Sequence, residues 1–222
     1  MEYSKIDKLG VNPSLLGFGC MRFPKKEDDT IDEVEAERML DHAIESGVTY
    51  IDTAYPYHDG ESEPFVGRVL KKYKRKDYYL ATKLPMFKID SLQQAKDIFE
   101  EQMKRLDVDY VDFYLLHALN KDTWKKVIDL NIIPYCEELK KQGRIKNFGF
   151  SFHDDYEVFE EIINYRDWDF CQIQLNYIDT DIQAGMKGYK LTEEKNVPLV
   201  IMEPIKGGAL ASLSNDIEQV FT

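Results

Sequence analysis

The sequence predicts an α/β protein of the TIM (β/α)8-barrel type, incomplete, with about seven parallel strands and an N-terminal hairpin. Apolar runs that suit buried strands alternate strictly with segments of helical periodicity. Three of these runs end in an ionisable residue, at Asp52, Lys83 and His117, and the steps between them are 31 and 34 residues, about one strand–helix–strand repeat. No GxGxxG motif follows the first strand, which favours a barrel over a Rossmann sheet.

The first half of the chain opens with a short polar segment, residues 1–14, which we expect to form a hairpin that plugs one end of the fold. A strand follows at residues 15–20, and Thr30 and Glu33 make a capping box that predicts the start of the first helix. Gly47 ends that helix before the strand at 48–52. The remaining elements of this half are a helix at 63–73, a strand at 78–83, a helix opened by the Ser91 capping box and a strand at 111–117.

The second half continues the alternation. We expect a helix at 124–142, a strand at 144–150, a helix capped by Asp154, a strand at 171–175, a helix near 181–195 and a strand at 198–203. Only 19 residues follow Glu203, fewer than one repeat, so the single domain of residues 1–222 is expected to lack its C-terminal strand–helix unit. The first and seventh strands would then be open edges, which proteins normally cover. A gapped barrel, a homo-oligomer that covers the edge, or a longer parent protein would each meet this requirement.

Composition narrows the class of protein. A net charge of −12 disfavours a nucleic-acid partner, because the chain would repel phosphates. The basic run at residues 71–76 is expected to be a solvated helix end. The three cysteines are far apart and form no CxxC pair, which indicates reduced thiols, a cytoplasmic location and no metal site. The sequence has no 18-residue apolar stretch, so we expect no membrane partner.

The ionisable residues at the strand ends predict a site. In a parallel barrel Asp52, Lys83 and His117 would meet at the carboxyl ends of neighbouring strands, with Tyr57 on the loop five residues after Asp52. The ammonium is expected to lower the phenol pKa, the carboxylate to keep the ammonium charged, and the imidazole to hydrogen-bond the same substrate oxygen. These groups suit proton donation to a carbonyl that becomes an alcohol. Because none of them can supply a hydride, a nicotinamide is expected across the barrel mouth.

The motifs in this region resemble a known family. Asp52-Thr-Ala-Tyr-Pro-Tyr57, followed by Gly60-Glu-Ser-Glu63, is similar to the aldo-keto reductase signature, and further family motifs recur in order up to Gly208. The resemblance implies a TIM barrel, reversible NADPH-dependent reduction of a small carbonyl substrate, and the catalytic tetrad Asp52, Tyr57, Lys83 and His117. The residue types at positions 151–153 and 202–204 resemble those of a microbial branch of the family, whose longer members carry a C-terminal ferredoxin-like domain.

The same resemblance implies a set of cofactor-binding residues for NADP(H). Ser151 and Gln172 match the residues that hydrogen-bond the carboxamide, although Phe152 stands where the family usually has an asparagine. Met202 occupies the position of the residue that stacks on the nicotinamide and offers an apolar, polarisable face. The loop over the pyrophosphate corresponds to Pro204, Lys206, Gly207 and Gly208. In the family, the clamp on the adenosine 2′-phosphate follows strand eight.

Two other functions are compatible with these residues. A Schiff-base aldolase or lyase would use Lys83 as its nucleophilic amine. A catalytically impaired or cofactor-sensing protein would keep the tetrad without turning over a substrate. Trapping of an adduct on Lys83 distinguishes the first alternative, and titration with NADPH distinguishes the second.

Overall fold

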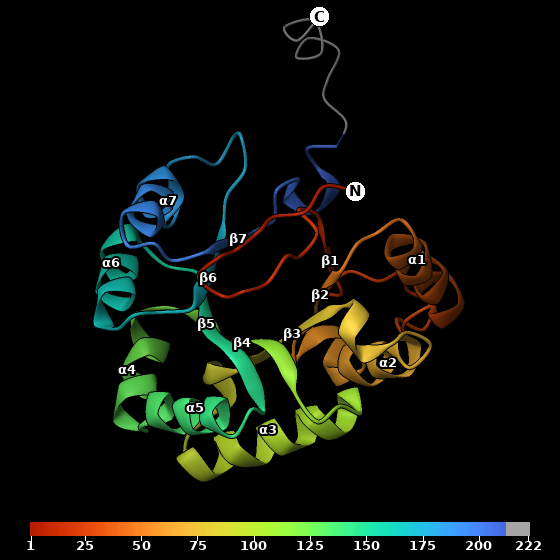
Figure 1. Cartoon of the computed structure of the whole chain (residues 1–222), viewed down its shortest axis with the longest axis horizontal. Coiled ribbons are helices and arrows are strands. Elements are labelled where there is room, and N and C mark those ends of the chain that lie inside the picture. The colour runs from red at the N-terminus through yellow and green to blue at the C-terminus, as the bar shows by residue number, and fades with distance from the viewer. Residues whose placement is uncertain (212–222) are drawn as a thin grey trace, which may run out of the picture.

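The computed structural model describes residues 1–211, whose seven strands form one parallel sheet in the order β1-β2-β3-β4-β5-β6-β7. Figure 1 shows this sheet curled around a central axis, with the helices on its outer side. The predicted barrel class with about seven parallel strands is confirmed. The strands are β1 (Gly17–Gly19), β2 (Tyr50–Asp52), β3 (Tyr79–Leu84), β4 (Val111–Leu119), β5 (Ile145–Phe152), β6 (Phe170–Gln174) and β7 (Leu199–Met202).

The helices pack their apolar faces against the outer side of the sheet and form the larger of two hydrophobic clusters with it. They are α1 (Glu33–Glu45), α2 (Ser62–Leu70), α3 (Leu92–Leu106), α4 (Lys121–Asp129), α5 (Ile132–Lys141), α6 (Tyr156–Tyr165) and α7 (Gly185–Glu194). Short 3-10 turns are η1 (Tyr57–Gly60), η2 (Arg75–Asp77), η3 (Met86–Lys88) and η4 (Lys206–Gly208). No helix of residues 1–211 is long and apolar enough to cross a bilayer.

The single helix predicted at 124–142 is wrong, because the structure breaks it into α4 and α5. Asn131 adopts a left-handed conformation with φ 54°, which an α-helix cannot contain. Pro134 lies in the first turn of α5, where a residue without an N–H is tolerated but could not continue a preceding helix. The two residues therefore mark a helix end and a new helix start.

The predicted helix caps are partly right. Ser91 caps α3 as predicted and accepts a hydrogen bond from the Gln94 N–H at 3.2 Å. The N-cap of α1 is Asp32 rather than Thr30, and its carboxylate accepts from the Glu35 N–H. The N-cap of α6 is Asp155 rather than Asp154. At α1 a neighbouring side chain that can cap takes the position, whereas Asp155 at α6 makes no capping hydrogen bond with its side chain.

The N-terminal hairpin is confirmed. Ile6 and Val11 form an antiparallel bridge, and Leu9 and Val11 pack against the smaller hydrophobic cluster inside the curled sheet. In Figure 1 this segment, drawn in red, crosses the middle of the ring of strands. The hairpin therefore fills the inner space at the end away from the predicted site.

Strands β1 and β7 are the two ends of the described sheet order, as expected for a barrel that does not close. β1 pairs with β2, and β7 pairs with β6. The predicted absence of an eighth strand concerns residues 212–222, which lie outside the described residues.

Side chains alternate between the two sides of each strand, and this alternation positions the site. In β3, Ala81 belongs to the inner cluster, whereas Leu80 and Leu84 belong to the outer one. Lys83, two residues after Ala81, therefore points inward, and Thr82 points outward toward the helices. The inward positions at the strand ends thus include Lys83, one of the ionisable residues predicted to form the site.

Candidate active site

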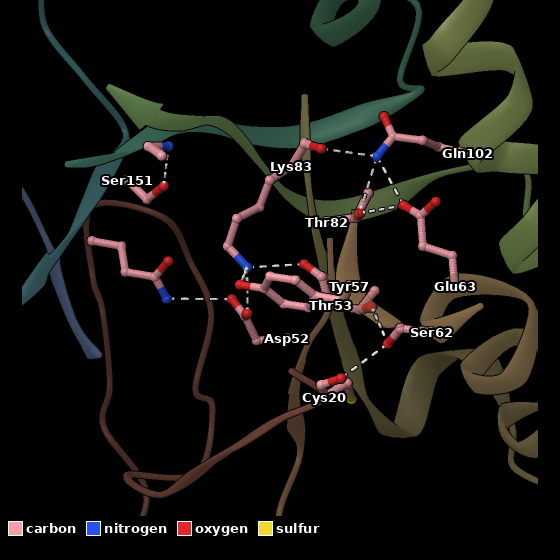
Figure 2. Close-up of polar contacts among 12 residues, drawn as sticks. Cys20, Asp52, Thr53, Tyr57, Ser62, Glu63, Thr82, Lys83, Gln102 and Ser151 are labelled. Carbon is pink, nitrogen blue, oxygen red and sulfur yellow. Dashed lines mark hydrogen bonds and ion pairs between the residues drawn. The ribbon is translucent and has the colours of Figure 1, made fainter. Parts of the chain in front are cut away.

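Lys83 is the centre of the polar cluster at the carboxyl ends of the strands (Figure 2). Its side chain is buried, and its Nζ donates to three oxygens: a carboxylate oxygen of Asp52, the Thr53 carbonyl oxygen at 2.9 Å and the Tyr57 hydroxyl oxygen at 3.1 Å. An ammonium has three N–H donors, so each one has an acceptor. Asp52 also accepts from the Gln172 amide at 3.3 Å. The structure thus brings four of the predicted residues into one hydrogen-bonded group.

The turn after β2 directs Tyr57 back over the strand ends. His58 and Asp59 have left-handed backbones with φ 51° and 55°, and Gly60 follows with φ 96°. Three successive positive φ values reverse the chain within η1, and the third falls on glycine, which has no Cβ to clash. The Tyr57 ring centroid consequently lies 4.8 Å from Lys83 Nζ. The Tyr57 hydroxyl oxygen accepts a hydrogen bond from the same ammonium.

His117 lies beside this group at the end of β4. Its ring centroid is 5.8 Å from that of Tyr57 with an angle of 79° between the planes, so the two rings meet edge to face. The ring is buried, and its Nδ1 has no hydrogen-bond partner among the described residues. An irregularity in the β4–β5 pairing follows His117, where Ala118 has φ 53°. The imidazole therefore lies beside the Tyr57 phenol.

The charges of the cluster are set by burial and by neighbouring groups. Burial lowers the pKa of Lys83, but the Asp52 charge and the hydrogen bonds to Asp52 and Tyr57 outweigh it, so the net pKa is raised. Burial lowers the pKa of His117 well below its ordinary value, and Lys83 and His153 lower it further. At neutral pH the cluster therefore contains a charged lysine and a neutral imidazole.

The expected lowering of the Tyr57 pKa is wrong in its net direction. Lys83 does lower this pKa, but burial raises it by more and the Asp52 charge adds to the rise. The phenol is thus protonated at neutral pH. Because its oxygen already accepts from Lys83, its own O–H is free to donate to another group.

The residues predicted to hold the carboxamide line the inner side of β5 and β6. Ser151 and Gln172 are register partners on these strands, and both are buried. The Ser151 hydroxyl oxygen accepts from the Ala118 N–H at 2.8 Å, which ties β5 to the end of β4 after His117. The Gln172 side-chain oxygen is buried with no hydrogen-bond partner among residues 1–211. A free acceptor at this position fits the N–H donors of a carboxamide.

The other predicted cofactor residues lie at the end of β7 and beyond it. Met202 is half-buried and pairs in register with Gln174, and Pro204 follows on the loop. Lys206 is exposed and forms an ion pair with Asp179 at 2.9 Å. Gly207 and Gly208 have φ 66° and 100°, conformations that favour glycine. No hydrogen bond or ion pair of the described residues joins this loop to Lys83 or Tyr57.

Within residues 1–211, no group of three histidine, cysteine, aspartate or glutamate side chains is arranged to hold a metal ion. The three cysteines are buried and unpaired.

Comparison with known proteins identifies the family. A family model described as the aldo/keto reductase family matches residues 15–222. The chain belongs to the aldo/keto reductase family.

Three relatives show how much of an aldo/keto reductase the chain spans. It is 31% identical over 155 residues to probable aldo-keto reductase 1 of Glycine max, covering 66% of this chain and 44% of that protein. It is 24% identical over 203 residues to the NADH-specific methylglyoxal reductase of Escherichia coli strain K12, covering 80% of this chain and 60% of the relative. The solved holo form of aldo-keto reductase AKR11C1 from Bacillus halodurans is 30% identical in sequence and superposes with a TM-score of 0.73, covering 90% of this chain and 65% of that structure. The chain thus spans between about two fifths and two thirds of these relatives.

Sequence reasoning missed several residues of this candidate site. Thr53 contributes only its backbone carbonyl, which no side-chain pattern reveals. Phe87 on η3 packs against the His117 ring at 5.7 Å and remains 46% exposed, so it forms an apolar wall at the mouth. Arg22 lies against Gly207, where an added Cβ would be 1.4 Å from a guanidinium nitrogen. Residues that meet only through the fold carry no signal in their spacing.

Proposed function

We propose that this chain reduces an aldehyde or ketone to an alcohol with NADPH, and that Tyr57 is the general acid. The observation that carries the proposal is the Lys83 ammonium, which contacts both the Asp52 carboxylate and the Tyr57 hydroxyl. A buried lysine that serves packing alone has no need of a phenol on a reversed turn. Membership of the aldo/keto reductase family supports the same reaction class.

The direction of the hydrogen bonds indicates which group donates the proton. Tyr57 accepts from Lys83 and keeps its own proton for a substrate carbonyl oxygen. As that proton leaves, negative charge develops on the phenol oxygen 3.1 Å from Lys83 Nζ. Asp52 keeps the lysine charged, so the developing phenolate is stabilised in a site of low dielectric. The neutral His117 donates an N–H hydrogen bond to the same substrate oxygen and fixes its orientation.

The cofactor proposal rests on Ser151 and Gln172, whose hydroxyl and free amide oxygen suit the carboxamide of a nicotinamide. When bound, the reduced nicotinamide supplies the hydride. We assign the face of the ring to Met202 and the pyrophosphate to Pro204, Lys206, Gly207 and Gly208. The choice of NADPH over NADH is part of the proposal. The Escherichia coli relative named NADH-specific makes the measurement of both cofactors necessary.

The Schiff-base alternative is disfavoured by the state of Lys83. An amine nucleophile must be unprotonated, and Asp52 raises the pKa of Lys83 above its ordinary value. A cofactor-sensing role remains the alternative to test, because it needs the same binding residues without turnover. We further propose that the substrate is a small carbonyl compound, that the protein acts in the cytoplasm, and that a second copy covers the edges of β1 and β7.

The test is aldehyde-dependent oxidation of NADPH by wild type, Tyr57→Phe and Tyr55→Phe. Tyr57→Phe is expected to reduce turnover by about 10³-fold or more, since it removes the proton donor. Tyr55 is the matched control, because its hydroxyl bonds Glu101 on the outer side of the fold and not Lys83. Undiminished turnover in Tyr57→Phe would refute its role. NADPH binding without turnover in the wild type would favour the cofactor-sensing alternative.

A further inference from the structure

A second polar cluster lies behind β3, on the helix side of the sheet (Figure 2). Its centre is Glu63, in the first turn of α2, whose side chain is completely buried. One carboxylate oxygen accepts from the Thr82 hydroxyl at 2.6 Å and from the Gln102 amide at 2.8 Å. A buried carboxylate is costly unless its hydrogen bonds are made. The cluster therefore holds Glu63 in one defined position.

This cluster contacts the backbone of the catalytic lysine. The amide nitrogen of Gln102 donates to the Lys83 carbonyl oxygen at 3.0 Å as well as to Glu63. The Tyr114 hydroxyl donates to the Gln102 side-chain oxygen at 2.7 Å, which fixes the orientation of the amide. Thr82, the other donor to Glu63, immediately precedes Lys83. The Glu63 cluster thus fixes β3 at the residue whose side chain crosses to the inner side.

The other carboxylate oxygen of Glu63 faces the turn that carries Tyr57. It makes no hydrogen bond among the described residues and lies 3.6 Å from Nη1 of Arg105 on α3, which is an ion-pair contact. The same nitrogen donates to the carbonyl oxygens of Tyr55 and Gly60, both at 3.4 Å, and the guanidinium lies 4.2 Å from the Tyr55 ring centroid. Tyr55 and Gly60 flank Tyr57 on either side. Arg105 therefore connects Glu63 to the turn that places the phenol.

We propose that Glu63 is a positioning residue that links the strand of Lys83 to the turn of Tyr57 and so sets the separation of the ammonium and the phenol. One carboxylate oxygen is bound to the strand through Thr82 and Gln102, and the other faces the turn through Arg105. The two reacting side chains belong to different elements, and this link adds to the β2–β3 pairing in fixing their separation. The catalytic consequence rests on the proposed function, whereas the geometric link does not.

The first experiment measures the phenol directly. Protein labelled with ¹³C at the tyrosine ζ carbons is titrated from neutral pH to the highest pH at which the protein stays folded, and the Tyr57 resonance is assigned by its loss in Tyr57→Phe. In Glu63→Gln, loss of the carboxylate weakens the hold on Arg105 and loosens the turn. We expect Tyr57 to titrate at a higher pH than in the wild type, with less phenolate at any given alkaline pH, because the contact with Lys83 that lowers its pKa weakens.

The matched control is Glu100→Gln, on the same helix as Gln102 and Arg105. Glu100 pairs with Arg144 at 3.0 Å and its side chain is 61% exposed. In Glu100→Gln, Tyr57 is expected to titrate at the same pH as in the wild type. A folded Glu63→Gln protein with an unchanged Tyr57 titration would overturn the proposal. If Glu63→Gln does not fold, Thr82→Val removes one hydrogen-bond donor to Glu63 at similar side-chain volume. A rise in the pH at which Tyr57 titrates would then support the proposal, and an unchanged titration would overturn it.

Kinetics provide the second readout. In an active wild type, Glu63→Gln should lower kcat by about 10- to 100-fold with KM within about twofold, since misplacement of reacting groups by about 1 Å costs rate rather than binding. The alkaline limb of its pH profile should move with the Tyr57 titration, which a loss of stability alone would not cause. Failure of the wild type to oxidise NADPH would refute the proposed function. The resonance of Tyr57 would still confirm or overturn the positioning role.

Discussion

Removal of the Asp52 charge is the perturbation that separates electrostatics from packing in this site. Asp52→Asn keeps the shape of the side chain but leaves the Lys83 ammonium, whose side chain is 2% exposed, with only neutral acceptors. Breaking a buried pair from one side typically costs about 3–5 kcal/mol. In a domain of this size, each kcal/mol of lost stability lowers Tm by about 2–4 °C, so this cost corresponds to a loss of about 6–20 °C in Tm.

The pH dependence makes this prediction specific. In the wild type the pKa of Lys83 is raised, so its stabilisation is complete below the unfolded value of about 10.4 and is lost only as pH rises through the folded pKa. In Asp52→Asn burial dominates, and the pKa should fall below the unfolded value. The variant then gains stability as pH rises toward about 10.4, because the neutral amine no longer buries a charge.

Urea denaturation at neutral pH and at about pH 9.5 measures both effects, provided that the slope of unfolding free energy with urea is unchanged. The difference from the wild type is expected to shrink at the higher pH. The double variant Asp52→Asn with Lys83→Met should recover much of the lost stability, since no unpaired charge remains. A loss below about 1 kcal/mol at neutral pH, or a difference that grows with pH, would refute the reasoning.

Two further predictions follow from burial. The His117 ring should stay neutral between about pH 6 and 8, and its resonance, assigned with His117→Asn, should not titrate there. Its lowered pKa should also cost stability as pH falls below about 6.5, and titration of the wild-type His117 ring near that value would contradict this. Gly149→Ala would place a Cβ 2.4 Å from the Phe170 carbonyl oxygen and push β5 away from β6, and the free energy of unfolding measured in urea should fall by about 3 kcal/mol. Gly19→Ala, with nothing within 4 Å, is its control, and equal stabilities would contradict the packing.

The site residues on the strands could be predicted because they follow a simple period. Asp52 and Lys83 lie on inward positions at the carboxyl ends of parallel strands, so their meeting follows from repeat length and alternation. Gln172, which also contacts Asp52, was predicted only through the family resemblance. Tyr57 needed the family signature as well, since its placement depends on the left-handed residues His58 and Asp59. Left-handed backbone is uncommon for any residue other than glycine, even though aspartate and histidine adopt it more often than most, so it has a weak sequence signal.

Other features depended on contacts between distant segments. The break at Asn131 was missed because the apolar pattern of α4 and α5 continues across it. The net pKa of Tyr57 was predicted in the wrong direction because burial, which the sequence does not show, outweighs the charge of Lys83. The role of Glu63 was equally hidden, since its partners Thr82 and Gln102 are 19 and 39 residues away.

Transfer of label from cofactor to product tests the central claim most directly. NADPH deuterated at the transferring position is incubated with a small aldehyde and either wild type or Tyr57→Phe, and the alcohol is analysed by mass spectrometry. Hydride transfer from the nicotinamide, with Tyr57 as the proton donor to oxygen, predicts one deuterium on the carbinol carbon per turnover in the wild type. It also predicts almost none in Tyr57→Phe, with NADPH binding retained. Unlabelled alcohol from the wild type, or labelled alcohol from Tyr57→Phe at the wild-type rate, would contradict it.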